Sequence, residues 1–189
     1  MDNIKYMVKG VMTLLFVVTL FSCEGNFKKI QKLNLKDGAP FAEGKKIDLK
    51  YTDSGKVVTN LIASKLWDYS NLKFPYQEFP EGVEVHFWDD NKENTVTSDY
   101  AIRYAKTGII DLRRNVVLVT SDSLTLKADQ LYWDQKNKWV FTDEPYRIEF
   151  KDGSHNDGAR LDSSEDFKEI ISRKNLGVQI IDKTKIDGE

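Results

Sequence analysis

The chain has 189 residues, of which 28 are basic and 30 acidic, and its formal net charge is −2. Charges of both signs are interspersed, as on a solvated surface, and no basic patch indicates nucleic-acid binding. If residues 1–22 are removed, the remaining 167 residues suffice for one domain with a real hydrophobic core.

Residues 1–22 have the pattern of an export signal. Lys5 and Lys9 precede an uncharged run of twelve residues, from Gly10 to Phe21. Twelve residues fit the apolar segment of a signal peptide, whereas a membrane span needs about 20. A buried core helix is the alternative, and it is disfavoured because the run is apolar on every face. We therefore predict a signal peptide at residues 1–22.

The apolar run ends in Leu20-Phe21-Ser22-Cys23, which resembles the lipobox of bacterial lipoproteins. In that motif the cysteine receives a diacylglycerol and becomes residue one, although Phe21 is bulkier than the usual residue. Cys23 is the only cysteine, so an exported chain can form no internal disulfide. An unused thiol is the alternative. We expect a lipid on Cys23, because two or three acyl chains anchor a protein durably, followed by a polar tether at residues 23–42.

Residues 43–182 have the pattern of a β domain, followed by a charged tail at residues 183–189. Short runs of aromatic and β-branched residues alternate with polar turns. Strict alternation places Val83, Val85 and Phe87 on one face of a strand and polar residues on the other. One dry face and one wet face indicate antiparallel sheets. Turns are predicted at residues 89–94, 106–108, 121–123, 134–138 and 151–153.

A repeat of thirty residues runs through this domain. Ser98-Asp99 recurs as Ala128-Asp129, and Asn115-Val116 recurs as Pro145-Tyr146. Each unit reads as an outgoing strand, a turn and a returning strand. Because one unit cannot bury its apolar face alone, we expect units to stack into a pile of strands with an edge at each end.

One segment, Ser164–Lys174, admits two interpretations. Phe167, Ile170 and Ile171 have helical spacing, and Gly177 lies beyond the end. The thirty-residue period favours a strand, which is our prediction, with a helix as the alternative.

Catalytic, metal and cofactor sites are not indicated. His86 and His155 stand alone in the sequence, and His86 falls on the wet face of its strand. The adjacent acids at residues 89–90 and 143–144 lie in predicted turns, where carboxylates are usually just solvated. Gly55-Lys56 lacks the remainder of a phosphate-binding loop. We therefore expect no catalytic residues, metal or cofactor.

Large apolar residues of the predicted strands should line the inside of the stack. On sequence alone a fully packed core is the favoured interpretation of this face. A lipid-binding groove differs only in being incompletely filled, which a sequence cannot reveal. The candidate lining residues are Val85, Phe87, Ile102, Leu118, Leu126, Trp139, Phe141, Ile148 and Phe150.

The stretch from Ala128 to Ile148 resembles the LptC family, a periplasmic component of the lipopolysaccharide export machinery. The most specific part is Thr142-Asp143-Glu144-Pro145-Tyr146-Arg147-Ile148. The preceding unit of the family is matched by Ser98–Tyr104, Thr107-Gly108 and Arg114-Asn115-Val116. Asp162–Phe167 resembles its last turn, and the likeness covers about residues 45–181.

The resemblance implies an all-β fold, an open twisted β-jellyroll of two antiparallel sheets, and a protein that is not an enzyme. The ligand would be lipopolysaccharide, with its acyl chains between the sheets. One sheet edge would meet the membrane subunits LptF and LptG of an ABC transporter, and the other an LptA-like bridge protein. Many members keep an N-terminal transmembrane helix, which a lipid on Cys23 would replace. The expected location is the periplasmic face of the inner membrane, rather than the outer membrane.

Two other classes of protein remain open. One is a glycan-binding surface lipoprotein with a closed β-sandwich, which would expose aromatic side chains near a loop end. Trp67, Trp88 and Trp133 are the candidates for such a surface. The other is a β-sandwich hydrolase, which would need two carboxylates about 5–10 Å apart across a cleft.

Overall fold

The computed structural model describes residues 39–89 and 91–180, and these form fourteen β-strands. The predicted signal peptide, Cys23 and the charged tail lie outside the described residues. Among the described residues no helix is long and apolar enough to cross a membrane. The strands are β1 (Ala42–Asp53), β2 (Lys56–Asp68), β3 (Tyr76–Phe79), β4 (Val83–Asp89), β5 (Lys92–Ser98), β6 (Tyr100–Tyr104), β7 (Ile109–Val119), β8 (Thr125–Asp134), β9 (Trp139–Thr142), β10 (Tyr146–Glu149), β11 (His155–Gly158), β12 (Arg160–Ser164), β13 (Ile170–Arg173) and β14 (Leu176–Val178).

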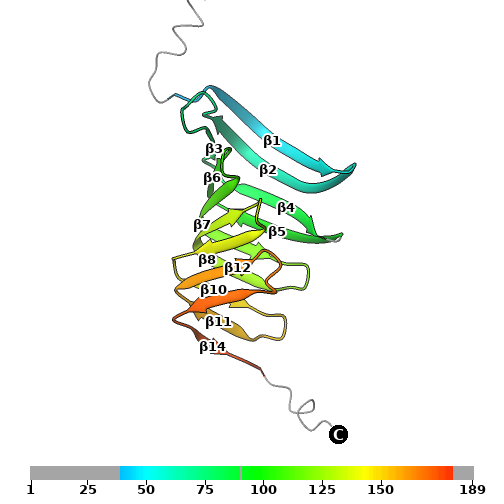
Figure 1. The fold of residues 1–189 in the computed structure, drawn as a ribbon, viewed down its shortest axis with the longest axis vertical. Helices are drawn as coiled ribbons and strands as arrows, with labels where there is room; N and C mark the ends of the chain where they lie inside the picture. Colours follow the sequence, from blue (N-terminus) through cyan, green and yellow to red (C-terminus); the bar gives the residue numbers. More distant parts are fainter. Residues whose placement is uncertain (1–38, 90, 181–189) are drawn as a thin grey trace, which may run out of the picture. The chain divides into compact units, whose positions relative to one another are not determined.

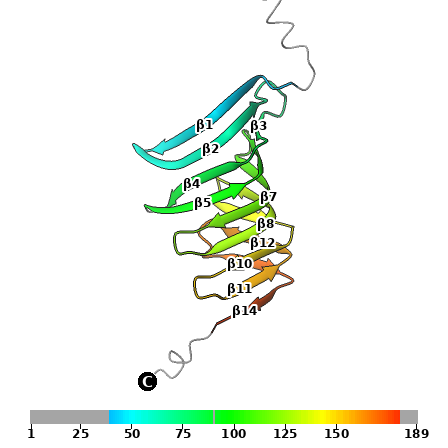
Figure 2. The same cartoon turned by 180° about the vertical axis from the view of Figure 1, so that it is seen from behind.

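The strands form one antiparallel hydrogen-bonded network that folds into two layers (Figures 1 and 2). The first layer runs β1-β2-β4-β5-β7-β8-β10-β11-β14, and the second runs β1-β2-β3-β6-β7-β8-β9-β12-β13. Four long strands, β1, β2, β7 and β8, belong to both layers. The first half of β8, for example, pairs with β10, and its second half pairs with β9. This arrangement is the predicted two-sheet antiparallel β-jellyroll.

The chain passes between the layers at regularly spaced corners. These lie at Asp99, residues 114–115, Asp129, residues 143–145, Ala159 and residues 174–175, so they recur about every fifteen residues. At the second corner the pairing of β7 with β8 shifts register, and Arg114 and Asn115 have positive φ angles of 63° and 49°. Two successive passages account for the thirty-residue repeat of the sequence.

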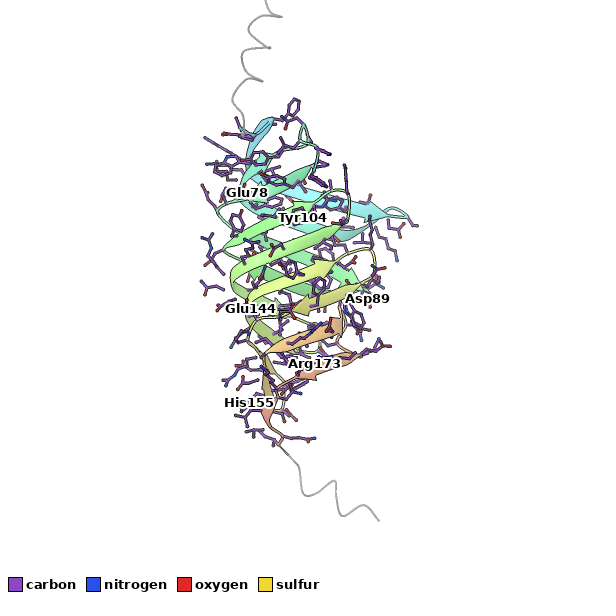
Figure 3. The ribbon with its side chains drawn as sticks, turned by 60° about the vertical axis from the view of Figure 1, so that its left-hand side comes forward. Glu78, Asp89, Tyr104, Glu144, His155 and Arg173 are labelled. Atoms are coloured by element: carbon purple, nitrogen blue, oxygen red, sulfur yellow. The ribbon has the colours of Figure 1, made fainter. Side chains whose placement is uncertain are left out.

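The corners and the hairpin turns lie on opposite sides of the two layers. We call these the corner side and the turn side. Figure 3 shows Glu144, at a corner, and Asp89, at the end of β4, on opposite sides of the β domain. Four predicted turns fall between strands on the turn side, at residues 106–108, 121–123, 134–138 and 151–153. The predicted turn at 89–94 is shorter in the structure, because β5 already begins at Lys92.

Alternation within the strands sends one set of apolar side chains between the layers. In β4, Val83, Val85 and Phe87 are buried, whereas Glu84 is exposed, as predicted. The two layers meet where the ring of Phe87 in the first packs against that of Trp133 in the second, with centroids 4.9 Å apart. The core therefore lies between the layers.

Residues 164–174 form a turn and a strand, so the helical alternative is wrong. β13 (Ile170–Arg173) pairs with β12 in an antiparallel register. Phe167 lies in the turn with a positive φ of 56°, and its side chain is buried in the core. Ile170 and Ile171 are exposed, so the apparent helical spacing arises from one buried turn residue beside an edge strand.

Candidate functional site

The apolar interior between the layers is the first candidate site. Five of the predicted lining residues are buried in it, namely Val85, Phe87, Leu118, Leu126 and Ile148. Other residues of this interior were not among the predicted ones. The main ones are Leu61, Phe79, Val96, Ile110, Leu112, Leu131, Trp133, Val140, Leu161 and Phe167.

Four predicted lining residues do not face the interior. In β6 the inward side chain is Ala101, so its neighbour Ile102 lies on the outer face. In β9 the inward residues are Val140 and Thr142, which leaves Trp139 and Phe141 outside. Phe150 follows the last residue of β10 and is exposed. The sequence interpretation chose the largest apolar residues, whereas strand parity selects smaller ones here.

The outer face of the second layer carries an aromatic cluster, which accounts for the outward position of Phe141. Phe141 stacks on Tyr132 with ring centroids 5.1 Å apart, and Tyr76 approaches Tyr104 at 6.5 Å. A hollow of about 270 Å³ is lined by Phe74, Pro75, Tyr104, Lys106, Thr107, Ile109, Tyr132 and Phe141. Both faces of this layer are thus partly apolar, which blurs the alternation in the sequence.

The three tryptophans proposed for glycan binding do not form a common exposed surface. Trp133 is buried in the core, and its indole N–H donates to Glu165 at 3.1 Å. Trp67 is half-buried with the ammonium of Lys65 4.6 Å from its ring centroid. Trp88 is half-buried beside the His86 ring at 6.3 Å. The glycan-binding alternative therefore lacks the aromatic surface on which it depended.

The free edges of the two layers are the second candidate site. Among the described residues, β1 pairs only with β2, β13 only with β12, and β14 only with β11. Apolar side chains are exposed on the last two edges. They include Ile171 in β13, and Leu176 and Val178 in β14, with Leu176 77% exposed. Such edges offer unpaired backbone groups and apolar contacts to an added strand.

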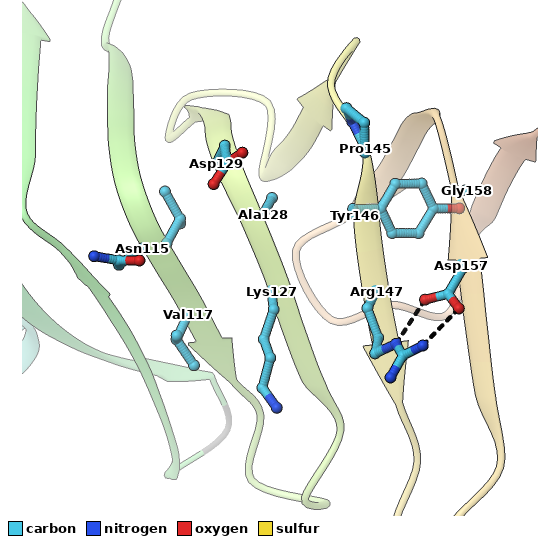
Figure 4. Close-up of a pocket in the computed structure, with 11 residues that line it drawn as sticks. Asn115, Val117, Lys127, Ala128, Asp129, Pro145, Tyr146, Arg147, Asp157 and Gly158 are labelled. Atoms are coloured by element: carbon cyan, nitrogen blue, oxygen red, sulfur yellow. Dashed lines mark hydrogen bonds and ion pairs between the residues drawn. The ribbon is translucent and has the colours of Figure 1, made fainter.

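The most family-like segment, residues 142–148, builds the corner between β9 and β10. Figure 4 shows Tyr146 lying over Gly158 of the neighbouring β11, and Arg147 facing Asp157. The Arg147 guanidinium donates two hydrogen bonds to Asp157, at 2.6 and 2.7 Å, and these lower the pKa of that carboxyl. A hollow of about 530 Å³ lies beside them on the outer face. These residues hold strands together at the corner.

Carboxylates and histidines are dispersed or paired with cations. Asp89 pairs with Lys138 at 3.3 Å, and Asp143 with Arg160 at 3.4 Å, while Asp90 lies outside the described residues. His86 contacts Glu84 and Glu93. Within residues 39–89 and 91–180 no group of three or more His, Cys, Asp or Glu side chains is arranged to hold a metal ion.

The fold and its candidate sites define an all-β jellyroll protein of two antiparallel layers, with an apolar interior and free edges. Residues 11–170 match the family described as lipopolysaccharide-assembly, LptC-related. The chain belongs to this LptC family, whose members act in lipopolysaccharide transport as bridge components rather than enzymes. The family places it in the export system of the periplasm and inner membrane. No curated protein matches the chain.

Proposed function

We propose that this protein is a lipid-anchored periplasmic transfer protein. It receives lipopolysaccharide from an inner-membrane ABC transporter and passes it along a jellyroll bridge toward the outer membrane. The continuous apolar interior carries the proposal. The side chains of this interior come from strands along the length of the β domain, from Leu61 in β2 to Leu161 in β12. Burying an acyl chain in such an interior lowers the free energy by about 25 cal/mol for each Å² of apolar surface removed from water.

The free edges support a role as one section of a longer bridge. An added strand at an edge satisfies the backbone N–H and C=O groups and continues the layer into the partner. The membrane subunits LptF and LptG and an LptA-like protein are the proposed partners at the two ends. In this arrangement the apolar interior continues from one protein to the next, and a lipid crosses the junction without meeting water.

Cys23 supports the proposed location. A lipid on this residue would hold the protein at the periplasmic face of the inner membrane, with residues 23–42 as the tether. Changing Cys23 to Ala behind a cleavable signal should release a soluble, folded protein into the periplasm. If the wild type is released equally, and mass spectrometry finds no acyl chains on it, the lipid anchor is refuted.

Site-specific photo-crosslinking tests the lipid path. A photoreactive residue at Phe87, Leu131 or Ile148 points between the layers, and it should capture lipopolysaccharide in cells that export it. The adjacent positions Trp88 and Tyr132 point to the outer faces and serve as matched controls. Absence of capture at all interior positions in folded protein would refute the path, as would equal capture at the outward controls.

Charged substitutions test the edges. Ile171→Lys and Val178→Lys each place a charge on an edge strand. Both native side chains are already more than half exposed, so the fold should survive. Co-purification of one bridge partner should be lost. Ile62→Lys is the control, because Ile62 is exposed on β2, which lies between β1 and β4 rather than at an edge. Retained binding by the edge variants would refute strand addition there.

A further inference from the structure

We infer that Asp89, Lys138 and Glu165 form an inter-sheet clamp, which closes the turn side of the two layers and must open before an acyl chain enters. The inference rests on the proposed function, since it concerns access to the same apolar interior. It adds a conformational step, with named residues, to that transfer.

The clamp joins residues of different layers. Asp89 ends β4, which pairs only with β2 and β5 of the first layer among the described strands. Lys138 lies in the turn between β8 and β9 of the second layer. Its Nζ is 3.3 Å from Asp89 Oδ1 and 3.7 Å from Glu165 Oε1. Glu165 lies in the turn between β12 and β13 of the same layer as Lys138. The ion pair of Asp89 and Lys138 therefore bridges the layers, forty-nine residues apart in the chain.

The position of the clamp allows it to control access. On the corner side the backbone itself runs from one layer to the other, so the layers cannot separate there. On the turn side, each turn among the described residues joins two strands of the same layer, so no described backbone segment crosses between the layers there. Asp89 lies on that side, opposite the corner residue Glu144 (Figure 3). Opening is thus confined to the side that the clamp closes.

The clamp is hydrogen-bonded to the aromatic pair of Phe87 and Trp133, which fills the interior between the layers beside it. The indole N–H of Trp133 donates to Glu165 Oε2 at 3.1 Å, and the Trp133 ring packs on Phe87 of the other layer. The backbone N–H of Glu165 donates to the carbonyl of Lys138 at 3.0 Å, which fixes the two turns relative to each other. Because Phe87 and Trp133 are both buried, the structure is the closed state. Acyl chains can occupy this level only if the two rings separate.

The exposure of the clamp suits a contact that opens and closes. The side chain of Lys138 is 65% exposed and that of Asp89 41%, so water screens their attraction and replaces it when the layers part. Glu165 is mostly buried at 13%, and it stays bonded to its own layer. A matched ion pair exists within one layer, Lys127 with Glu149 at 2.9 Å, with exposures of 50% and 39%. It joins β8 to β10 and spans no opening.

A cleavable tether tests the clamp. Asp89→Cys with Lys138→Cys is linked by a bismaleimide that contains a reducible disulfide, in the full chain carrying Cys23→Ser and a photoreactive residue at Ile148. The purified protein is then offered lipopolysaccharide in detergent. The tether should reduce capture at Ile148 by about tenfold or more, because only the open state binds, and reduction of the tether should restore it.

The control is the same tether between Lys127→Cys and Glu149→Cys, which should leave capture unchanged. Lys138→Met should increase the rate of capture, whereas Lys127→Met should not. Equal capture with and without the Asp89–Lys138 tether refutes the clamp and leaves the proposed function standing. If the untethered protein captures no lipopolysaccharide, the proposed function fails first and the clamp with it.

Discussion

Gly158 provides a sharp test of how closely β10 and β11 are packed at their corner. It lies opposite Tyr146, and a Cβ at this position would be 2.5 Å from Tyr146 Oη, 2.6 Å from Cζ and 2.7 Å from Cε1. The ring is 4% exposed and its hydroxyl is hydrogen-bonded to Ser172. Because the contacted atoms belong to a rigid buried ring, Gly158→Ala must displace it.

The expected loss follows from two opposing terms. Overpacking of this kind costs about 1–3 kcal/mol, and replacing glycine in a strand recovers about 0.5–1 kcal/mol of backbone entropy, so we expect a net loss of about 1.3 kcal/mol. For a chain of this size the melting temperature should fall by roughly 4 °C. Urea unfolding followed by tryptophan fluorescence measures the loss directly.

Two variants make the test specific. Gly44→Ala would clash only with the terminal Cδ1 of Ile47, at 2.6 Å, which can rotate away, and Leu66 Cβ at 3.5 Å would be in ordinary van der Waals contact. The substitution should therefore be nearly neutral. In a Tyr146→Ala background, Gly158→Ala should no longer destabilise, because the ring is gone. An equal penalty in both backgrounds would refute the explanation from the ring contact.

Three further predictions concern polar groups. Asp111→Ala should lower the free energy of unfolding, measured in urea, by about 2 kcal/mol, because this buried carboxylate accepts hydrogen bonds from Arg113. Asp111→Asn should lose less stability. Equal stability of Asp111→Ala and the wild type would contradict this prediction. Burial raises the pKa of Glu165, so the free energy of unfolding should fall as the pH rises from 4.5 through the folded pKa of this group. Glu165→Gln should lack this fall. If the pH profiles of the wild type and the variant run parallel, the effect does not come from Glu165. A hydrogen bond from Lys168 leads the contacts that lower the pKa of Asp166 to about 2. The stability due to Asp166 is therefore complete above 3.8 and lost toward pH 2, where Asp166→Asn and the wild type should converge in thermal melts.

The strands and their repeat could be predicted because they depend on local alternation. Val83, Val85 and Phe87 face inward as their spacing requires, and the corners explain the thirty-residue period. Alternation fails where both faces are apolar. Phe141 is as hydrophobic as any core residue, yet it stacks on Tyr132 outside, and Ala101 takes the inward position that Ile102 was expected to fill.

The contacts between layers could not be predicted, because they join residues far apart in the chain. Asp89 was interpreted as a solvated turn acid, and its partner Lys138 lies forty-nine residues away. Trp133 was a candidate for a surface ligand site, but its indole is buried and bonded to Glu165, thirty-two residues on. Nothing in the local sequence marks such pairs, since they arise only when the layers close.

The regular spacing of the corners has a consequence for how such proteins change length in evolution. Every fifteen residues add one strand to each layer, and neighbouring strands lie about 4.8 Å apart. Duplicating one thirty-residue unit would therefore lengthen the molecule by roughly 10 Å, while the terminal strands stay as they are. The length of such a domain can thus be adjusted by whole units, with no change to the strands at its two ends.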